Sequence, residues 1–164
     1  DVGGPELHPT AGASAVGARQ FLIAYNLYLD AAEPPAHTAG ALPQSAQAGI
    51  AAARAIARAI RASTGGMPGV KAIGVMVNGR AQLSMNITDF SRTPMHSIRA
   101  VIGELVRNHR AVVTEAELIG LIPQDAYDPA AEWLREIPGF DPAAKVLERR
   151  LEHPLPWPGD LRSS

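Results

Sequence analysis

The sequence predicts an α+β domain in which an antiparallel sheet carries its main helices on one face. Segments with strand or helix periodicity follow in the order strand, helix, strand, strand, helix, strand. Asn78-Gly79 joins the middle two strands, and both residue types tolerate the positive φ angles of a two-residue hairpin turn. The two long helical segments repeat apolar residues at helical spacing. This order is the split βαβ, or ferredoxin-like βαββαβ sandwich, here with extra C-terminal helices.

The first strand is predicted from Arg19 to Leu29. Alternate positions from Phe21 to Leu29 are apolar, and most of the intervening positions are apolar as well. Such a strand is typical of the centre of a sheet, so we expect it to be covered on both faces. Residues 1–18 are rich in Gly, Pro and Ala and are predicted to form an arm without regular structure.

A proline-rich connecting loop over residues 30–43 precedes the first helix, which is predicted over residues 44–62. Ile50, Ala53, Ala57 and Ile60 form its inward stripe. Arginines 54, 58 and 61 line another side at helical spacing. This basic stripe is either a solvated helix face or a docking surface for the anionic tail of a ligand or for a partner domain.

Two strands are predicted over residues 70–77 and 81–89, after a turn-rich segment that holds Gly65, Gly66 and Gly69. The second of these strands alternates strictly between apolar and polar residues. Its apolar side is expected to pack on the helices, and its polar side (Gln82, Ser84, Asn86 and Thr88) to face whatever occupies the other side of the sheet.

The remaining elements follow from shorter signals. Thr93-Pro94 predicts a helix start, with Thr93 as N-cap. A short strand is predicted over 111–114 and two further helices over 124–136 and 142–152. Residues 19–153 are therefore expected to form one domain, and the proline-rich residues 154–164 a flexible tail.

Composition argues against several classes of function. The net charge of −1 and the aromatic content of 5% disfavour nucleic-acid binding, and no apolar run is long enough to cross a membrane. The absence of cysteine excludes disulfides and thiolate chemistry, and the five scattered histidines predict no metal site. These features predict a cytoplasmic protein, and the start at Asp1 without Met predicts a fragment or a processed chain.

The candidate binding residues lie near glycine turns. Gly12 and Gly17 precede the first strand, where Arg19 could receive an anion beside exposed backbone donors. Lys71 follows a second glycine turn and is either solvated or a carboxylate partner. Each of the other candidates has a plain structural alternative: loop packing for His8, and hydrogen bonding at the sheet end for Asn86.

Several of these segments also carry a family resemblance. They are residues 12–26, Gly3, Leu7-His8-Pro9, residues 70–74, Ser84-Met85-Asn86 and residues 117–123. In this order they resemble glutamate formiminotransferase, and more narrowly the C-terminal subdomain of its transferase domain. The chain departs from the family pattern at Val2, Gly4 and Ser14, which affects the fine shape of the arm.

The resemblance implies a function. The family moves a formimino group from N-formimino-L-glutamate to N5 of tetrahydrofolate, a co-substrate held between two subdomains, and it uses no metal. It implies folate contacts from the arm and from the strand after the glycine turn. With the candidates above, the expected folate-binding residues are Gly3, His8, Pro9, Thr10, Gly12, Arg19, Gly69, Val70, Lys71, Ala72, Ile73, Gly74 and Asn86.

The family places its catalytic histidine on the N-terminal subdomain, so no catalytic residue is assigned in these 164 residues. The expected partners are folate, formimino-glutamate and that N-terminal subdomain; a homodimer stays open, and no nucleic acid or membrane is expected. The alternative is a non-catalytic ferredoxin-like binding or assembly module that kept the fold and lost the pocket.

Overall fold

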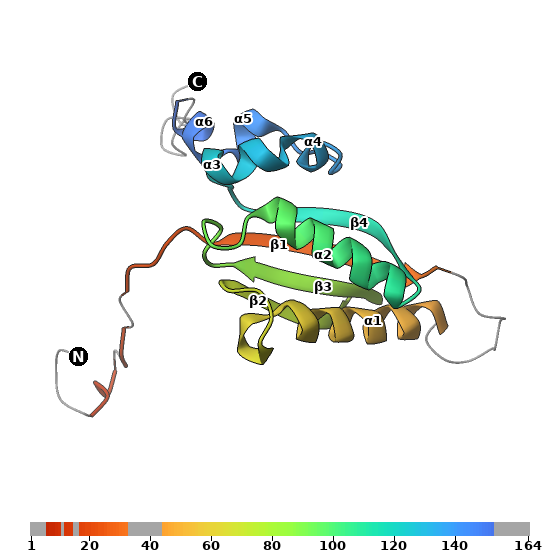
Figure 1. Cartoon of the computed structure of the whole chain (residues 1–164). Helices are drawn as coiled ribbons and strands as arrows, with labels where there is room; N and C mark the ends of the chain where they lie inside the picture. Colours follow the sequence, from red (N-terminus) through yellow and green to blue (C-terminus); the bar gives the residue numbers. More distant parts are fainter. Residues whose placement is uncertain (1–5, 11, 15–16, 33–43, 153–164) are drawn as a thin grey trace, which may run out of the picture.

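A computed structural model describes residues 6–10, 12–14, 17–32 and 44–152 of the chain. Its centre is a four-stranded antiparallel sheet with the strand order β2-β3-β1-β4 (Figure 1). The strands are β1 (Ile23–Ala31), β2 (Val70–Val77), β3 (Arg80–Ile87) and β4 (Ala111–Ile119). Helices α1 (Gln44–Ile60) and α2 (Met95–Asn108) complete the predicted βαββαβ order. The α+β prediction is therefore confirmed.

The C-terminal part of the chain is a group of short helices beside β4 (Figure 1). They are α3 (Gln124–Tyr127), α4 (Ala131–Leu134), α5 (Pro142–Lys145) and α6 (Leu147–Glu152), and 3-10 turns cover Ala62–Thr64 and Asp128–Ala130. The two predicted helices in this region are thus each divided. Val146 divides the second, because it is extended and bridges Ile122 instead of continuing the helix.

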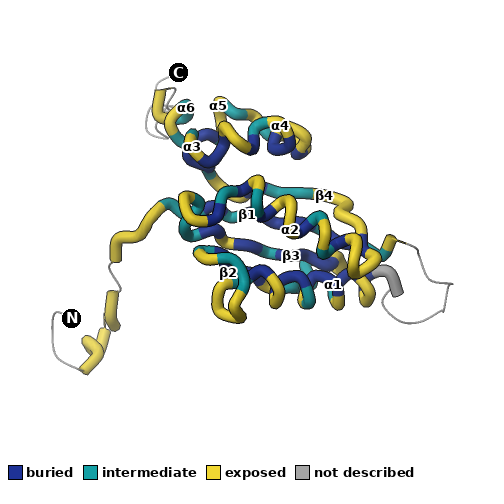
Figure 2. The backbone as a smooth tube through the Cα atoms, in the orientation of Figure 1, coloured by how far each residue is buried: buried dark blue, intermediate teal, exposed yellow. Residues whose placement is uncertain are grey.

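The core lies between the sheet and its helices. Ile23, Tyr25, Leu27 and Leu29 alternate along β1 and are buried against the apolar side of β3, as the alternation predicts (Figure 2). From α2, Met95, Ile98, Ile102 and Val106 are buried at spacings of three and four residues. Both long helices therefore cover the same face of the sheet.

The prediction that β1 is central is confirmed, because it pairs with both β3 and β4. The expectation that β1 is covered on both faces does not hold among the described residues. Ala24 and Tyr28, on the face away from α1 and α2, are only partly buried, and no described helix packs there. A strand can have apolar residues on both sides although no second layer covers it. This happens when small and aromatic residues alternate with the core residues.

Glycine 74 sets how closely α1 approaches β2. A Cβ atom at this position would lie 2.5 Å from the backbone nitrogen of Arg54 in α1. Gly74 is also on the core side of β2, opposite Leu83 of β3. The residue therefore lets helix and strand backbones pack directly against each other.

Two other predictions differ from the structure. Helix α2 begins at Met95, with Pro94 extended before it. Thr93 is buried and donates its hydroxyl to the carbonyl of Pro68 at 2.6 Å, so it links the preceding turn to α2 and caps nothing. Strand β4 continues beyond Thr114 to Ile119, because a register shift between Tyr28 and Leu29 lets the pairing with β1 resume after the interruption.

Strand β4 lies at the edge of the sheet, and the C-terminal helices cover part of that edge. Lys145 Nζ donates to the carbonyl oxygen of Leu118 at 3.1 Å, and Ile122 bridges Val146 just beyond the strand. Within the ranges that the structure describes, no helix has the length and apolar character needed to span a bilayer.

Candidate functional site

The face of the sheet that α1 and α2 leave uncovered is the candidate site, and we call it the open face. The strand register defines its members as Lys71, Ile73, Val75 and Val77 of β2; Arg80, Gln82, Ser84 and Asn86 of β3; Ala24, Asn26 and Tyr28 of β1; and Glu115, Glu117 and Ile119 of β4. The polar side of the predicted third strand lies on this face, as the alternation predicts.

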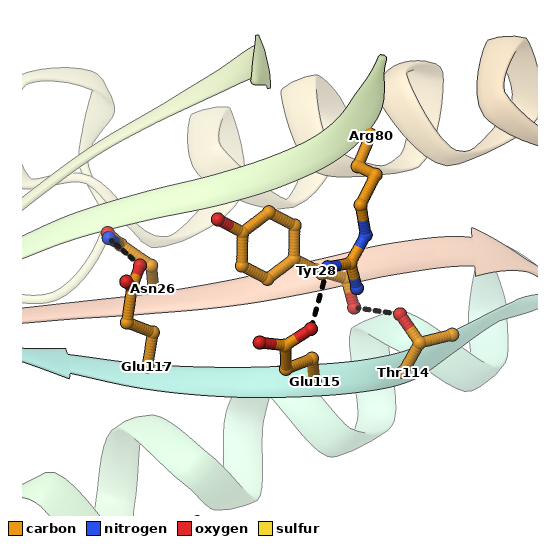
Figure 3. A network of polar contacts seen from close by, with 6 residues as sticks. All are labelled: Asn26, Tyr28, Arg80, Thr114, Glu115 and Glu117. Carbon is orange, nitrogen blue, oxygen red and sulfur yellow. Dashed lines mark hydrogen bonds and ion pairs between the residues drawn. The ribbon is translucent and has the colours of Figure 1, made fainter. Parts of the chain in front are cut away.

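One end of the open face is occupied by polar pairs (Figure 3). Arg80 Nη1 lies 2.6 Å from Glu115 Oε2, and the guanidinium carbon of Arg80 lies 4.1 Å from the ring centre of Tyr28. This ion pair raises the pKa of the Arg80 guanidinium further above its ordinary value. The arginine is thereby committed to partners within the chain.

The middle of the open face is more enclosed. Asn26 is 9% exposed and donates from Nδ2 to Glu117 Oε2 at 3.2 Å (Figure 3). Gln82, on the neighbouring strand, is 6% exposed. Two buried amides at the centre of a sheet face without helices show that neighbouring side chains shield this region from water.

The other end of the open face carries side chains that have no partner among the described residues. Lys71 and Asn86 lie opposite each other and are exposed, and Ser84 is next along β3. Across the described residues, none of these three side chains forms a hydrogen bond or ion pair. The structure thus brings together Lys71, Asn86 and Ile73, three of the residues predicted to bind a ligand, and the Ile73 side chain is 55% exposed.

The glycine turn before β2 borders this end. Gly69 has φ +73, and its carbonyl accepts hydrogen bonds from the backbone nitrogen and the hydroxyl of Thr88 at 2.7 and 2.9 Å. Beside it, the Asp89 carboxylate accepts from Ser91 Oγ at 2.6 Å and from the Arg92 backbone, and these bonds lower the pKa of Asp89. The turn is therefore tied firmly to the end of β3.

Three other predicted residues in β2 have their side-chain positions on the opposite side. Val70 and Ala72 are 1% and 4% exposed in the core, and Gly74 packs against α1. A ligand on the open face would meet these residues only through their backbone.

The arm brings a second set of predicted residues together in one turn. The Gly12 nitrogen donates to the His8 carbonyl at 2.9 Å, and the Thr10 nitrogen donates to His8 Nδ1 at 3.3 Å. Pro9 lies within this turn, and Gly12 has φ +67. Every described residue of the arm before Phe21 is exposed, and the arm runs away from the sheet in Figure 1. Gly3 lies outside the described residues.

Arg19 is exposed and lies between this turn and the start of β1, with Nη1 donating to the Gln20 carbonyl at 3.4 Å. The chain enters β1 at the end of the sheet where Ala24 pairs with Asn86. The arm and Lys71 are therefore attached to the same end of the open face, although the structure does not bring them into contact.

The basic stripe of α1 lies beside β2. Arg54, Arg58 and Arg61 line a shallow hollow of about 220 Å³ together with Ile73 and Gly74. The Nε atom of Arg61 is buried without a hydrogen-bond partner among the described residues. The stripe is thus continuous with the β2 edge that carries Lys71.

Two groups escaped the sequence reasoning. The sequence predicts neither the Arg80–Glu115 pair nor the Asn26–Glu117 pair, because the predicted last strand stops at Thr114. Glu115 and Glu117 nevertheless alternate with apolar residues, as strand residues do. Tyr25 lies within the electrostatic influence of Arg99 and Glu136, and burial raises the pKa of its hydroxyl. Nothing in the local sequence marks Tyr25 as different from its core neighbours.

Metal and proton-transfer chemistry receive little support from the described residues. They contain no group of three or more His, Asp or Glu side chains placed to hold a metal ion. His8, His96 and His109 are exposed on the arm, in the first turn of α2 and just after its end. The open face therefore offers binding groups and no histidine.

Comparison with known proteins gives a consistent result. The family model described as Formiminotransferase domain matches residues 24–150. The chain is 36% identical over 153 residues to glutamate formimidoyltransferase of Streptococcus pyogenes serotype M1, covering 92% of this chain and 46% of that protein.

Two further relatives agree. Identity is 31% over 151 residues to glutamate formimidoyltransferase of Thermoplasma acidophilum, with 91% of this chain and 44% of that protein covered. It is 33% over 138 residues to the formimidoyltransferase-cyclodeaminase of Gallus gallus, with 81% and 23% covered. The chain thus spans slightly less than half the length of the two relatives named glutamate formimidoyltransferase.

Proposed function

The chain belongs to the formiminotransferase domain family, and on that basis we propose that its open face forms one wall of a folate site. The site serves transfer of a formimino group from N-formimino-L-glutamate to tetrahydrofolate, a step of histidine degradation and one-carbon metabolism. In this reaction N5 of the folate attacks the formimino carbon, and the bond from that carbon to the glutamate nitrogen breaks. A proton lost from N5 is balanced by a proton gained by the leaving amine.

The observation that carries this proposal is the cluster of unpaired polar side chains on the uncovered face. Lys71, Asn86 and Ser84 meet at one end of it. Both substrates carry glutamate carboxylates, and a lysine ammonium with neighbouring amide and hydroxyl donors suits such groups. The arginine hollow beside Ile73 extends this positive edge and is a suitable place for the glutamate tail of folate.

The second wall and the proton-transferring histidine come from a further formiminotransferase segment, which resembles the family's N-terminal subdomain. The span of less than half of the two glutamate formimidoyltransferases supports this division, as does the lack of a described histidine on the open face. Enclosure between two walls would exclude water, which otherwise hydrolyses the reactive formimino carbon. The arm with His8, Pro9, Thr10 and Gly12 is proposed to close over the folate at this end.

Reassembly tests the proposal. The 164-residue chain is mixed with, or fused to, the part of the Streptococcus pyogenes relative that it does not cover. Light scattering then establishes that a complex forms, and calorimetry measures binding of 5-formyl-tetrahydrofolate to it. We expect folate binding and formimino transfer by the complex and no transfer by the chain alone. A stable complex that neither binds the folate nor transfers the group would overturn the proposal and favour a non-catalytic module.

A further inference from the structure

A separate cavity lies on the helix side of the sheet, at the outer edge of β4. Its volume is about 640 Å³, which is within the range of small-molecule sites. Residues of β1, α2 and β4 line it together with α4 and the segment that follows α4. Its apolar wall includes Leu27, Ile102, Ile137 and Pro138. None of the residues expected to bind folate lines it, and Glu115 is the one member of the open face among its lining residues.

Tyr25 supplies a polar group to this cavity. The residue is 5% exposed and lines the cavity, and the charges that act on its phenol are those of Arg99 and Glu136, two other cavity residues. Its hydroxyl has no hydrogen-bond partner in the described part of the chain. The Tyr25 hydroxyl is not among the fully buried unpaired polar atoms, so it keeps some contact with solvent at the cavity and is available to a ligand there.

Trp133 lies beside Tyr25 in the same wall of the cavity. Its ring meets that of Tyr25 edge-to-face, with 5.4 Å between the ring centres. Its indole Nε1 is buried and has no acceptor among the described residues. Two neighbouring aromatic residues therefore carry hydrogen-bond donors that nothing in the described chain satisfies.

The charge that remains available in the cavity is positive. Glu115 is paired with Arg80 at 2.6 Å, and Glu136 lies 3.8 Å from Arg99. Arg107 also lines the cavity, and its side chain has no ion pair or hydrogen bond with any described residue. The two cavity carboxylates, Glu115 and Glu136, are thus each paired with an arginine. The Arg107 guanidinium remains without a partner among the described residues.

We propose that this cavity binds a small organic carboxylate with an apolar body. The carboxylate accepts hydrogen bonds from the Tyr25 hydroxyl and from Arg107, and the body packs between Trp133 and the aliphatic wall. An apolar cavity with a few convergent polar groups is the usual form of such a site. Guanidinium groups bind carboxylates with directed hydrogen bonds, so a neutral analogue of the same shape binds less well.

Tryptophan fluorescence tests this assignment. The sequence holds two tryptophans, so Trp157→Phe makes Trp133 the reporter. Benzoate is the probe, benzamide its neutral match, and acetate a carboxylate without an apolar body. We expect a saturable change of Trp133 fluorescence with benzoate, and weaker binding of benzamide and acetate. Loss of one hydrogen bond to a charged group corresponds to about tenfold weaker binding, expected for Tyr25→Phe and for Arg107→Gln.

Matched controls separate the site from general effects. Tyr28→Phe, on the open face, and Arg58→Gln, on α1, should leave benzoate binding within about twofold of the parent chain, since this corresponds to less than one hydrogen bond. Circular dichroism checks that each variant is folded, and the exposed Arg107 keeps the test valid if Tyr25→Phe is unstable. Absence of a saturable response, equal binding of benzamide, or unchanged affinity in Arg107→Gln would each overturn the proposal.

Discussion

Lys71 of β2 and Asn86 of β3 lie opposite each other, and both point away from the helices with no side-chain partner among the described residues. They lie beside the Gly69 turn, where the sheet receives the chain from the arm. If this pair holds a folate carboxylate, removing either residue should weaken folate binding without unfolding the chain.

Lys71→Met is therefore expected to weaken binding of 5-formyl-tetrahydrofolate to the reassembled protein by about tenfold or more, because a charge-assisted hydrogen bond is lost. Asn86→Ala is expected to have a smaller effect, since it removes a neutral hydrogen bond of about 1 kcal/mol. Calorimetry measures both. Arg150→Met, which removes a cation from α6, serves as the control, and an equal loss in that variant would show that only general charge is involved.

Gly74→Ala is expected to destabilise the chain by about 1–3 kcal/mol, because the added methyl group meets the α1 backbone, which cannot move aside like a side chain. Urea denaturation measures the loss. The matched control is Gly103→Ala in α2, where the nearest atom to an added Cβ, apart from the backbone of α2 itself, is the flexible Arg107 guanidinium at 3.8 Å. That substitution should be neutral or raise stability by about 0.4–1 kcal/mol. Equal effects at both positions would contradict the close approach of α1 and β2.

Tyr25 is expected to limit stability in alkali. Burial raises its pKa in the folded chain above the ordinary value of about 10. Its contribution to the free energy of unfolding is therefore fully present below about pH 10 and is lost as the pH rises toward the folded pKa. In Tyr25→Phe, stability should fall less steeply in this alkaline range than in the parent. Denaturant titrations measure the slope, and Tyr28→Phe should retain the parent's steeper decline.

Asp89 is expected to make the stability of the folded chain depend on pH in the acidic range. Its pKa is lowered mainly by the Ser91 hydrogen bond, so its contribution is present above the ordinary aspartate value of about 3.9 and is lost as the pH falls through the lower folded value. Asp89→Ala should thus be less stable than the parent near neutral pH, and the difference should shrink in acid. Thermal melts at several pH values measure it. A difference that does not vary with pH would contradict this role.

The sheet could be predicted because its signals are local. The strict alternation of β3 and the Asn78-Gly79 turn determine a hairpin whatever surrounds them, and Asn78 and Gly79 have φ of +49 and +77. The end of β4 was missed because its continuation depends on the register shift opposite Tyr28 and Leu29, a feature of two strands together. The division of the second C-terminal helix at Val146 likewise depends on the long-range Ile122–Val146 bridge.

The candidate site was predictable in part for the same reason. Lys71, Ile73 and Asn86 share a face because strand alternation places them there. The packing of Gly74 against Arg54 was not predictable, because the sequence does not show how α1 lies against β2. The unpaired hydroxyl of Tyr25 is also invisible in sequence, since its surroundings come from α2 and from the segment around Trp133, far along the chain.

The contact between Lys145 and the Leu118 carbonyl has a consequence for self-association. An exposed edge strand can pair with a strand of a second molecule and so extend the sheet. A lysine at such an edge is a common feature that hinders this pairing. A shortened chain that stops at Gly120 would leave the outer edge of β4 exposed. Oligomers or fibrils are then the expected outcome. The C-terminal helices are therefore expected to limit pairing between the β4 edges of two molecules.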